Sequence, residues 1–114
     1  MFLDSSETGR NISAKLCADE VEKAKLYIKG SVHCFCKNNP DIPFSVRVLF
    51  GGVNKNWDDT PLQPIYNYYE TLGYTDAEER AAIDVGRLLK TVLSEDEIRT
   101  YTQIKGYTNE YIQV

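Results

Sequence analysis

The broadest apolar stripe of the chain lies at residues 76–93, which read DAEERAAIDVGRLLKTVL. Apolar residues recur there at spacings of three and four, so one face of an α-helix collects them. They are Ala81, Ala82, Val85, Leu88, Leu89 and Val92. This stripe predicts a helix at the centre of the core. Gly86 within it costs about 1 kcal/mol relative to alanine in a helix interior, so we expect another element to cross closely there.

Capping boxes mark three helix starts in the second half of the chain. In each, a hydroxyl side chain accepts a bond from an amide of the first turn, and a Gln or Glu three residues later reaches back to the cap. The pairs are Thr60 with Gln63, Thr75 with Glu78, and Ser94 with Glu97. They predict helices over residues 61–72, 76–93 and 95–105, of which the first and last end at glycines.

The first half of the chain combines one helical pattern with two alternating ones. Apolar spacings of three and four predict a helix over residues 14–29, although residues 12–17 also alternate and fit a strand. Alternation at Val32, Cys34 and Cys36, and again from Phe44 to Phe50, predicts a β-hairpin over residues 31–50 with a proline-containing turn. Residues 107–113 predict a C-terminal strand, and residues 1–4 a short N-terminal one.

These elements indicate a single α+β domain over residues 1–114, with a small antiparallel sheet covered by four helices. The C-terminal strand needs a partner for its backbone amides and carbonyls. It either joins the sheet of the 31–50 hairpin or pairs with a second copy of the chain. The second alternative predicts a homo-oligomer, with a dimer favoured.

Composition limits the classes of function. Hydrophobic residues make up 42% and charged residues 26% of the chain, as in ordinary globular proteins. The net charge of −4 argues against broad contact with nucleic acid, which needs a cationic face. No apolar run approaches the roughly 18 residues of a membrane span, and the N-terminus lacks the pattern of an export signal. With three cysteines, an odd number, these features predict a cytoplasmic protein.

A polar turn between the N-terminal strand and the first helix is the candidate anion site. Hydroxyls and a glycine at such a junction can bind a phosphate through backbone amides and the positive end of the helix dipole. The residues are Thr8, Gly9, Arg10 and Asn11. Locally, residues 2–11 resemble the phosphate loop of flavodoxins, which implies a bound phosphate group. The remaining strands depart from that fold, and an ordinary polar lead-in to the helix is the alternative.

The cysteines and the single histidine do not form a recognisable metal or catalytic set. On a strand, Cys34 and Cys36 share one face and His33 points to the other, so the three side chains do not converge. Reduced, buried cysteines fit this pattern better. We therefore predict no metal, no cofactor and no catalytic residue, and we favour a non-enzyme.

Tyrosines and the only tryptophan supply the candidate contact residues. Exposed tyrosines anchor protein interfaces and ligands, and the loop around the tryptophan combines a cation, carboxylates and an indole. The candidates are Trp57, Lys55, Asp58, Tyr66, Tyr69, Tyr74 and Tyr111. They predict a small binding or interaction protein that self-associates or binds another protein. The alternative is a small-molecule-binding protein or enzyme whose anionic ligand lies at residues 5–11.

Overall fold

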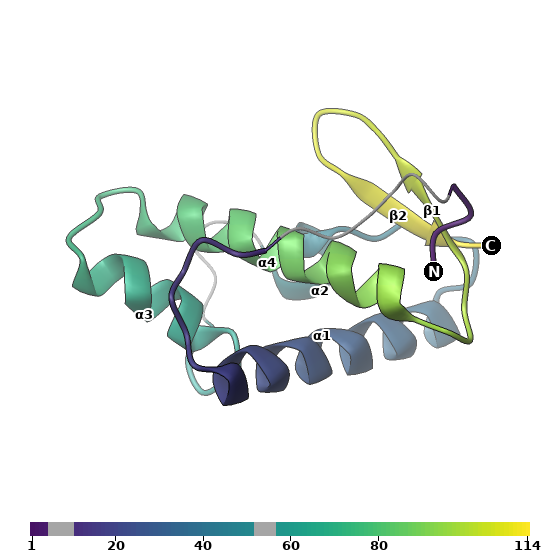
Figure 1. The fold of residues 1–114 in the computed structure, drawn as a ribbon. Helices are drawn as coiled ribbons and strands as arrows, with labels where there is room; N and C mark the ends of the chain where they lie inside the picture. The colour runs from purple at the N-terminus through teal and green to yellow at the C-terminus, as the bar shows by residue number, and fades with distance from the viewer. Residues whose placement is uncertain (5–10, 52–56) are drawn as a thin grey trace.

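The computed structural model describes residues 1–4, 11–51 and 57–114 (Figure 1). Within these ranges the chain forms four helices and one two-stranded antiparallel sheet, which confirms the α+β class. The elements are α1 (Ala18–Asn38), α2 (Val46–Phe50), α3 (Gln63–Thr71), α4 (Ala77–Glu95), β1 (Tyr101–Ile104) and β2 (Glu110–Gln113). No helix of the described ranges combines the length and apolar character needed to cross a bilayer.

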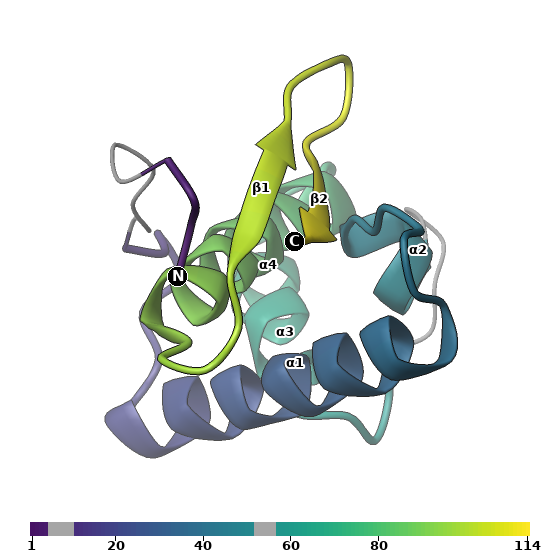
Figure 2. The same ribbon diagram turned by 90° about the vertical axis from the view of Figure 1, so that its right-hand side faces the viewer.

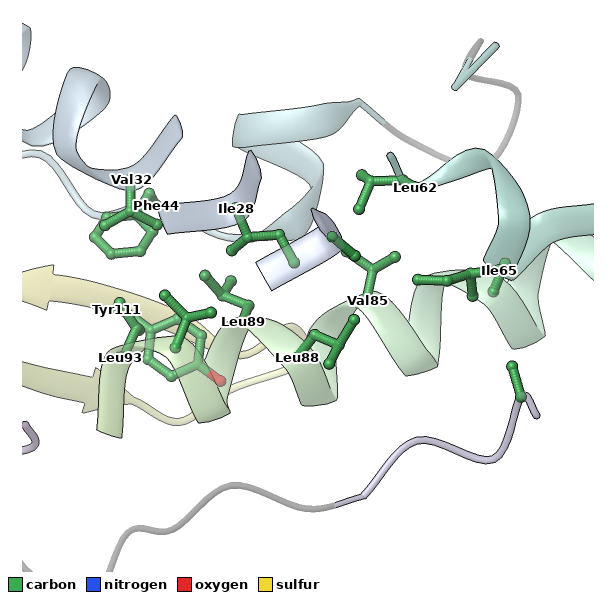
Figure 3. Packing of buried hydrophobic residues seen from close by; sticks show 14 of the residues in the cluster. Ile28, Val32, Phe44, Leu62, Ile65, Val85, Leu88, Leu89, Leu93 and Tyr111 are labelled. Carbon is green, nitrogen blue, oxygen red and sulfur yellow. The ribbon is translucent and has the colours of Figure 1, made fainter. Parts of the chain in front are cut away.

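Helix α4 is the centre of the core, as its apolar stripe predicts. It packs against α1, α2 and α3. Five of the six stripe residues are buried, and Ala82 is half-buried. In Figure 3, Val85, Leu89 and Leu93 of α4 meet Ile28 and Val32 of α1. The helices predicted over 61–72 and 76–93 are therefore correct to within a few residues.

The predicted hairpin over residues 31–50 is wrong, because α1 continues through Gly30 to Asn38. Its buried face repeats every four residues at Ala24, Ile28 and Val32, so the alternation after Gly30 also fits a helix. Gly30 lies on the open side, where an added Cβ would meet nothing within 4 Å. Its cost of about 1 kcal/mol is small against the packing of a 21-residue helix. The start is also corrected, since residues 12–17 form neither helix nor strand.

The second half of the predicted hairpin forms helix α2. Ser45 is its N-cap, and the Ser45 hydroxyl accepts a bond from the Val48 amide at 3.2 Å. This cap favours a helical turn at a sequence whose side chains favour a strand. Only Phe44 pairs with the sheet, through two backbone bonds of 2.8 Å to Tyr111.

The helix predicted over residues 95–105 is also wrong. Ser94 lies inside α4 and donates to the Thr91 carbonyl at 2.8 Å, so it caps nothing. Asp96 supplies the turn instead, since its carboxylate accepts bonds from the amides of Ile98 and Arg99 at 2.9 Å. The chain then enters β1, whose tyrosine, threonine and isoleucine favour a strand.

The C-terminal strand is confirmed as β2, and it pairs within its own chain. Tyr101 lies opposite Gln113, and Ile104 lies opposite Glu110. Phe2 forms an isolated bridge with Tyr101 on the outer side of β1. The predicted N-terminal strand over residues 1–4 is therefore reduced to this one bridge. Figure 2 shows both chain ends beside this hairpin, which stands above the helices. The hairpin thus pairs with two separate segments of its own chain, one at each edge.

Candidate functional site

A cleft of about 560 Å³ lies between α2, α4 and the turn that joins β1 to β2. Its size is within the range of about 300–1,000 Å³ that is typical of small-molecule sites. Apolar atoms come from Val46 of α2 and from Ala82 and Ile83 of α4. The turn contributes Thr108 and Asn109, which carry groups that form hydrogen bonds.

The cleft is cationic although the chain is acidic. Arg47 of α2 and Arg87 and Lys90 of α4 line it, and none of its described lining residues carries a carboxylate. The whole chain has a net charge of −4, so the charge of this lining is opposite in sign to that of the chain. An anion is the ligand charge that this wall favours.

Gly86 lines the same cleft in the middle of α4. A Cβ added there would lie 3.8 Å from Val46 Cγ2, which is an ordinary contact distance. Helix α2 therefore passes Gly86, as expected, but leaves room for a methyl group. Glycine costs about 1 kcal/mol in a helix interior, and no steric conflict requires it here. The effect of Gly86 on the structure is that its missing side chain leaves space in the cleft.

A buried carboxylate fixes the position of Arg87. Asp84 is 1% exposed, and its oxygens accept the backbone amides of Ser13 and Ala14 at 3.0 Å and the Tyr69 hydroxyl at 2.5 Å. Arg87 Nη1 lies 3.5 Å from Asp84 Oδ1 and donates to Ser13 Oγ at 2.8 Å. Within residues 1–4, 11–51 and 57–114, the Nε and Nη2 groups of Arg87 make no hydrogen bond.

Burial and the hydrogen bond to Asp84 raise the pKa of Tyr69 to about 12. The Tyr69 hydroxyl is therefore protonated at neutral pH and stays a donor to Asp84. This bond connects α3 to α4, while the Ser13 and Ala14 amides connect the segment before α1 to the same carboxylate. Arg87 is thus oriented by three parts of the chain.

A smaller cavity of about 240 Å³, the tyrosine pocket, adjoins the cleft along α4. Its aromatic walls are Tyr68, Tyr69 and Tyr74, with ring centroids 5.1 Å apart for Tyr68 and Tyr69 and 5.8 Å apart for Tyr69 and Tyr74. Arg80 Cζ lies 4.1 Å from the centroid of the Tyr74 ring, and Arg80 Nε donates to Asp76 at 2.9 Å. Stacking and the ion pair hold this guanidinium at the rim.

Of the predicted contact residues, Tyr69 and Tyr74 lie in the tyrosine pocket and Tyr111 lines the cleft. Tyr111 is only 3% exposed and packs against Phe44, so most of its ring belongs to the core (Figure 3). Tyr66 lies outside both cavities, and its hydrogen bond to Glu70 raises the pKa of Tyr66.

Trp57 and Asp58 of the predicted loop site are not among the described residues that line the cleft. Trp57 Nε1 donates to the Phe50 carbonyl at 3.1 Å, and Asp58 accepts a bond from Gln63 at 3.1 Å, so both organise the local chain. Lys55 and the anion-site residues Thr8, Gly9 and Arg10 lie outside the described residues. Asn11 is described and is exposed.

The predicted site residues do not include Arg47, Arg87, Lys90 or Tyr68, and Gly86 is singled out only as a place where another element crosses the helix. Arg80, Arg87 and Lys90 follow one another at intervals of seven and three residues, which places them on one face of a helix. This spacing could have indicated a cationic helix face that includes Arg87 and Lys90. Arg47 has no comparable signal, because its place in the cleft depends on how α2 packs on α4.

A second polar cluster lies where α1, α4 and β1 meet. His33 Nε2 lies 3.4 Å from Asp96 Oδ2 and 3.1 Å from Arg99 Nη1, and the Tyr101 hydroxyl donates to Asp96 at 2.8 Å. Burial alone would raise the pKa of Asp96, but bonds from the Arg99 and Ile98 amides, Tyr101 and His33 hold it well below its usual range. Burial likewise raises the pKa of Tyr101 far above its usual value. The charged carboxylate therefore joins three elements.

The cysteines do not add chemistry to this cluster. His33, Cys34 and Cys36 lie on α1, a correction of their predicted strand, and the described residues contain no group of three metal-ligating side chains. Burial raises the pKa of the Cys36 thiol, which favours the less nucleophilic protonated form.

No protein-family model, curated protein or solved structure matches this chain. An assignment of function therefore depends on the geometry and charge of the cavities.

Proposed function

We propose that this protein binds a small anionic ligand in the cleft between α2, α4 and the β1–β2 turn. The observation that carries the proposal is Arg87, a cleft-lining arginine whose guanidinium is held by buried Asp84 and by Ser13 through Nη1. A guanidinium fixed in this way binds a carboxylate or phosphate group through two parallel hydrogen bonds without first losing side-chain freedom.

The other lining residues support a ligand with both a charged and an apolar part. Arg47 and Lys90 add positive charge, while Val46, Ala82 and the open surface at Gly86 supply apolar contact. We therefore propose α4 as the place of the anionic ligand; residues 8–10 of the anion site predicted from the sequence lie outside the described residues.

The test is calorimetric titration of the purified chain with pyrophosphate and with citrate at low salt. We expect both to bind, and Arg87→Gln to weaken binding about tenfold or more, since a charge-assisted hydrogen bond contributes about 1.5–3 kcal/mol. Arg47→Gln should also weaken it, and this exposed side chain makes no hydrogen bond to a described residue, so the fold is spared.

The matched control is Lys23→Gln. Lys23 pairs with Asp19 on the exposed surface of α1, so this variant removes the same charge away from the cleft. Absence of binding by either anion, or equal loss in the Lys23 variant, would overturn the proposal.

Self-association is the second candidate function. The observation that favours it is a shallow apolar groove between α1 and α2, to which the exposed side chains of Leu26, Tyr27 and Val48 contribute. The partner proposed is a second copy of the chain. Native mass spectrometry should then show a dimer that Leu26→Glu dissociates and Ile98→Glu, at an 86% exposed position outside the groove, leaves intact. A strictly monomeric chain would exclude this candidate.

A further inference from the structure

The cleft and the tyrosine pocket share two lining residues of α4. These are Ile83 and Arg87, so the two cavities lie next to each other along this helix. A ligand whose acidic group binds Arg87 can therefore extend into the tyrosine pocket without leaving the protein.

The tyrosine pocket has the size and the walls of a site for one ring. Its volume is about 240 Å³. An apolar cavity of about 150 Å³ is enough to bind benzene. Tyr68, Tyr69 and Tyr74 already contact one another edge to face, with interplanar angles of 84° and 67°. A further ring can continue this arrangement, which aromatic groups prefer.

The charges of the site fix which end of the ligand enters the pocket. Asp84 lines the tyrosine pocket but not the cleft, and the Arg80 guanidinium of the pocket is already paired with Asp76, so the pocket offers an anion less positive charge than the cleft does. The cleft side offers Arg47 and Lys90 together with Arg87. The acidic group therefore faces the cleft, and the uncharged part lies against the tyrosines.

The walls of the pocket are held in place before a ligand arrives. The Tyr69 hydroxyl is bonded to buried Asp84, and Arg80 is held over the Tyr74 ring by its bond to Asp76. Because these groups are already ordered, little conformational freedom is lost when a ring enters.

We infer that the ligand is an aryl acid, with an aromatic ring in the tyrosine pocket joined to a phosphate or carboxylate at Arg87. This inference rests on the proposed function, because it assumes that the cleft binds the acidic group.

The experiment compares three phosphate monoesters by calorimetry: phenyl, cyclohexyl and propyl phosphate. It is done at a pH well above the second phosphate pKa of about 6, so that all three are dianions of equal charge. We expect phenyl phosphate to bind about tenfold more tightly than propyl phosphate, since an aromatic contact and the burial of a ring together favour it. Cyclohexyl phosphate should bind less tightly than phenyl phosphate.

Two variants locate the preference. Tyr74→Leu, at a 42% exposed position, should lower the ratio of phenyl to propyl phosphate affinity until it is close to the ratio of cyclohexyl to propyl phosphate affinity. Tyr66→Leu, in α3 but not among the residues that line the pocket, should leave the ratio unchanged.

The outcomes separate this inference from the function it extends. If all three esters bind equally, or if cyclohexyl matches phenyl phosphate, the aromatic inference is overturned while anion binding stands. If none binds, the proposed function itself fails and the inference fails with it.

Discussion

Asp96 shows how a single buried charge can hold separate elements together. Its carboxylate accepts bonds from the amides of Ile98 and Arg99 and from the hydroxyl of Tyr101, and it faces His33 of α1. These bonds favour the ionised form, so the pKa of Asp96 is lower in the folded chain than in the unfolded chain.

A carboxylate with a depressed folded-state pKa contributes stability above its unfolded pKa of about 3.9 and loses it as the pH falls below that value. We therefore expect Asp96→Asn to lower the free energy of unfolding at pH 7 by about 2 kcal/mol, since it weakens several charge-assisted bonds. Below pH 4 the difference between the two proteins should shrink. Urea unfolding between pH 2.5 and 7 measures it.

The control for this prediction is Asp76→Asn. Asp76 is also paired, with Arg80, but its side chain is 43% exposed, so the pair contributes little. A constant difference between wild type and Asp96→Asn across this pH range would contradict the role given to the ionised carboxylate.

At the scale of elements, two helical glycines offer a matched comparison. Gly86 of α4 lines the cleft, and Gly30 of α1 does not. Because a Cβ fits at both positions, each Gly→Ala change should raise the free energy of unfolding by about 0.5–1 kcal/mol. Only Gly86→Ala places a methyl group in the cleft, so only that variant should weaken binding of phenyl phosphate.

Thermal unfolding and calorimetry on the two variants test this prediction. Equal ligand affinity in both would show that Gly86 does not shape the site. A loss of stability in Gly86→Ala would show instead that α2 packs too closely for a side chain.

The elements also show why some structure was predictable from sequence and some was not. The buried residues of α4 all belong to one helix and follow its period, so the local sequence is enough to predict which of them are buried. The alternation at Val32, Cys34 and Cys36 fits two periods, and the packing of α1 on α4 selects the helical one. Ser94 heads a capping pattern, but α4 continues through it because the next turn is made by Asp96.

The candidate site was less predictable than the fold, because its residues come from distant segments. Tyr69 and Tyr74 stand out by residue type. Arg87 becomes distinctive only through Asp84 and Ser13, and the Ser13 contact joins positions 74 residues apart. No spacing in the sequence indicates that contact.

At the scale of the whole molecule, an acidic chain must attract an anion to its cationic cleft. The net charge of −4, acting over a radius of gyration of 13.7 Å, repels a single negative charge by about 1 kcal/mol in water without salt. Cations at contact distance near a protein surface attract it by several times this amount, about 4 kcal/mol for one pair. The local attraction therefore dominates.

This comparison predicts how salt changes affinity. At 0.1 M salt the Debye length is about 10 Å, so salt first removes the weak long-range repulsion and then screens the partly exposed cations of the cleft. We expect phenyl phosphate to bind several-fold more weakly at 500 mM than at 50 mM sodium chloride. Over this range salt mainly reduces the attraction between the ligand and the cations of the cleft, which is larger than the repulsion by the whole chain. Titration of Arg47→Gln should give a shallower salt dependence, since one screened contact is gone. An affinity that rises with salt would mean that the overall negative charge governs binding, and the ligand site would then lie away from these cations.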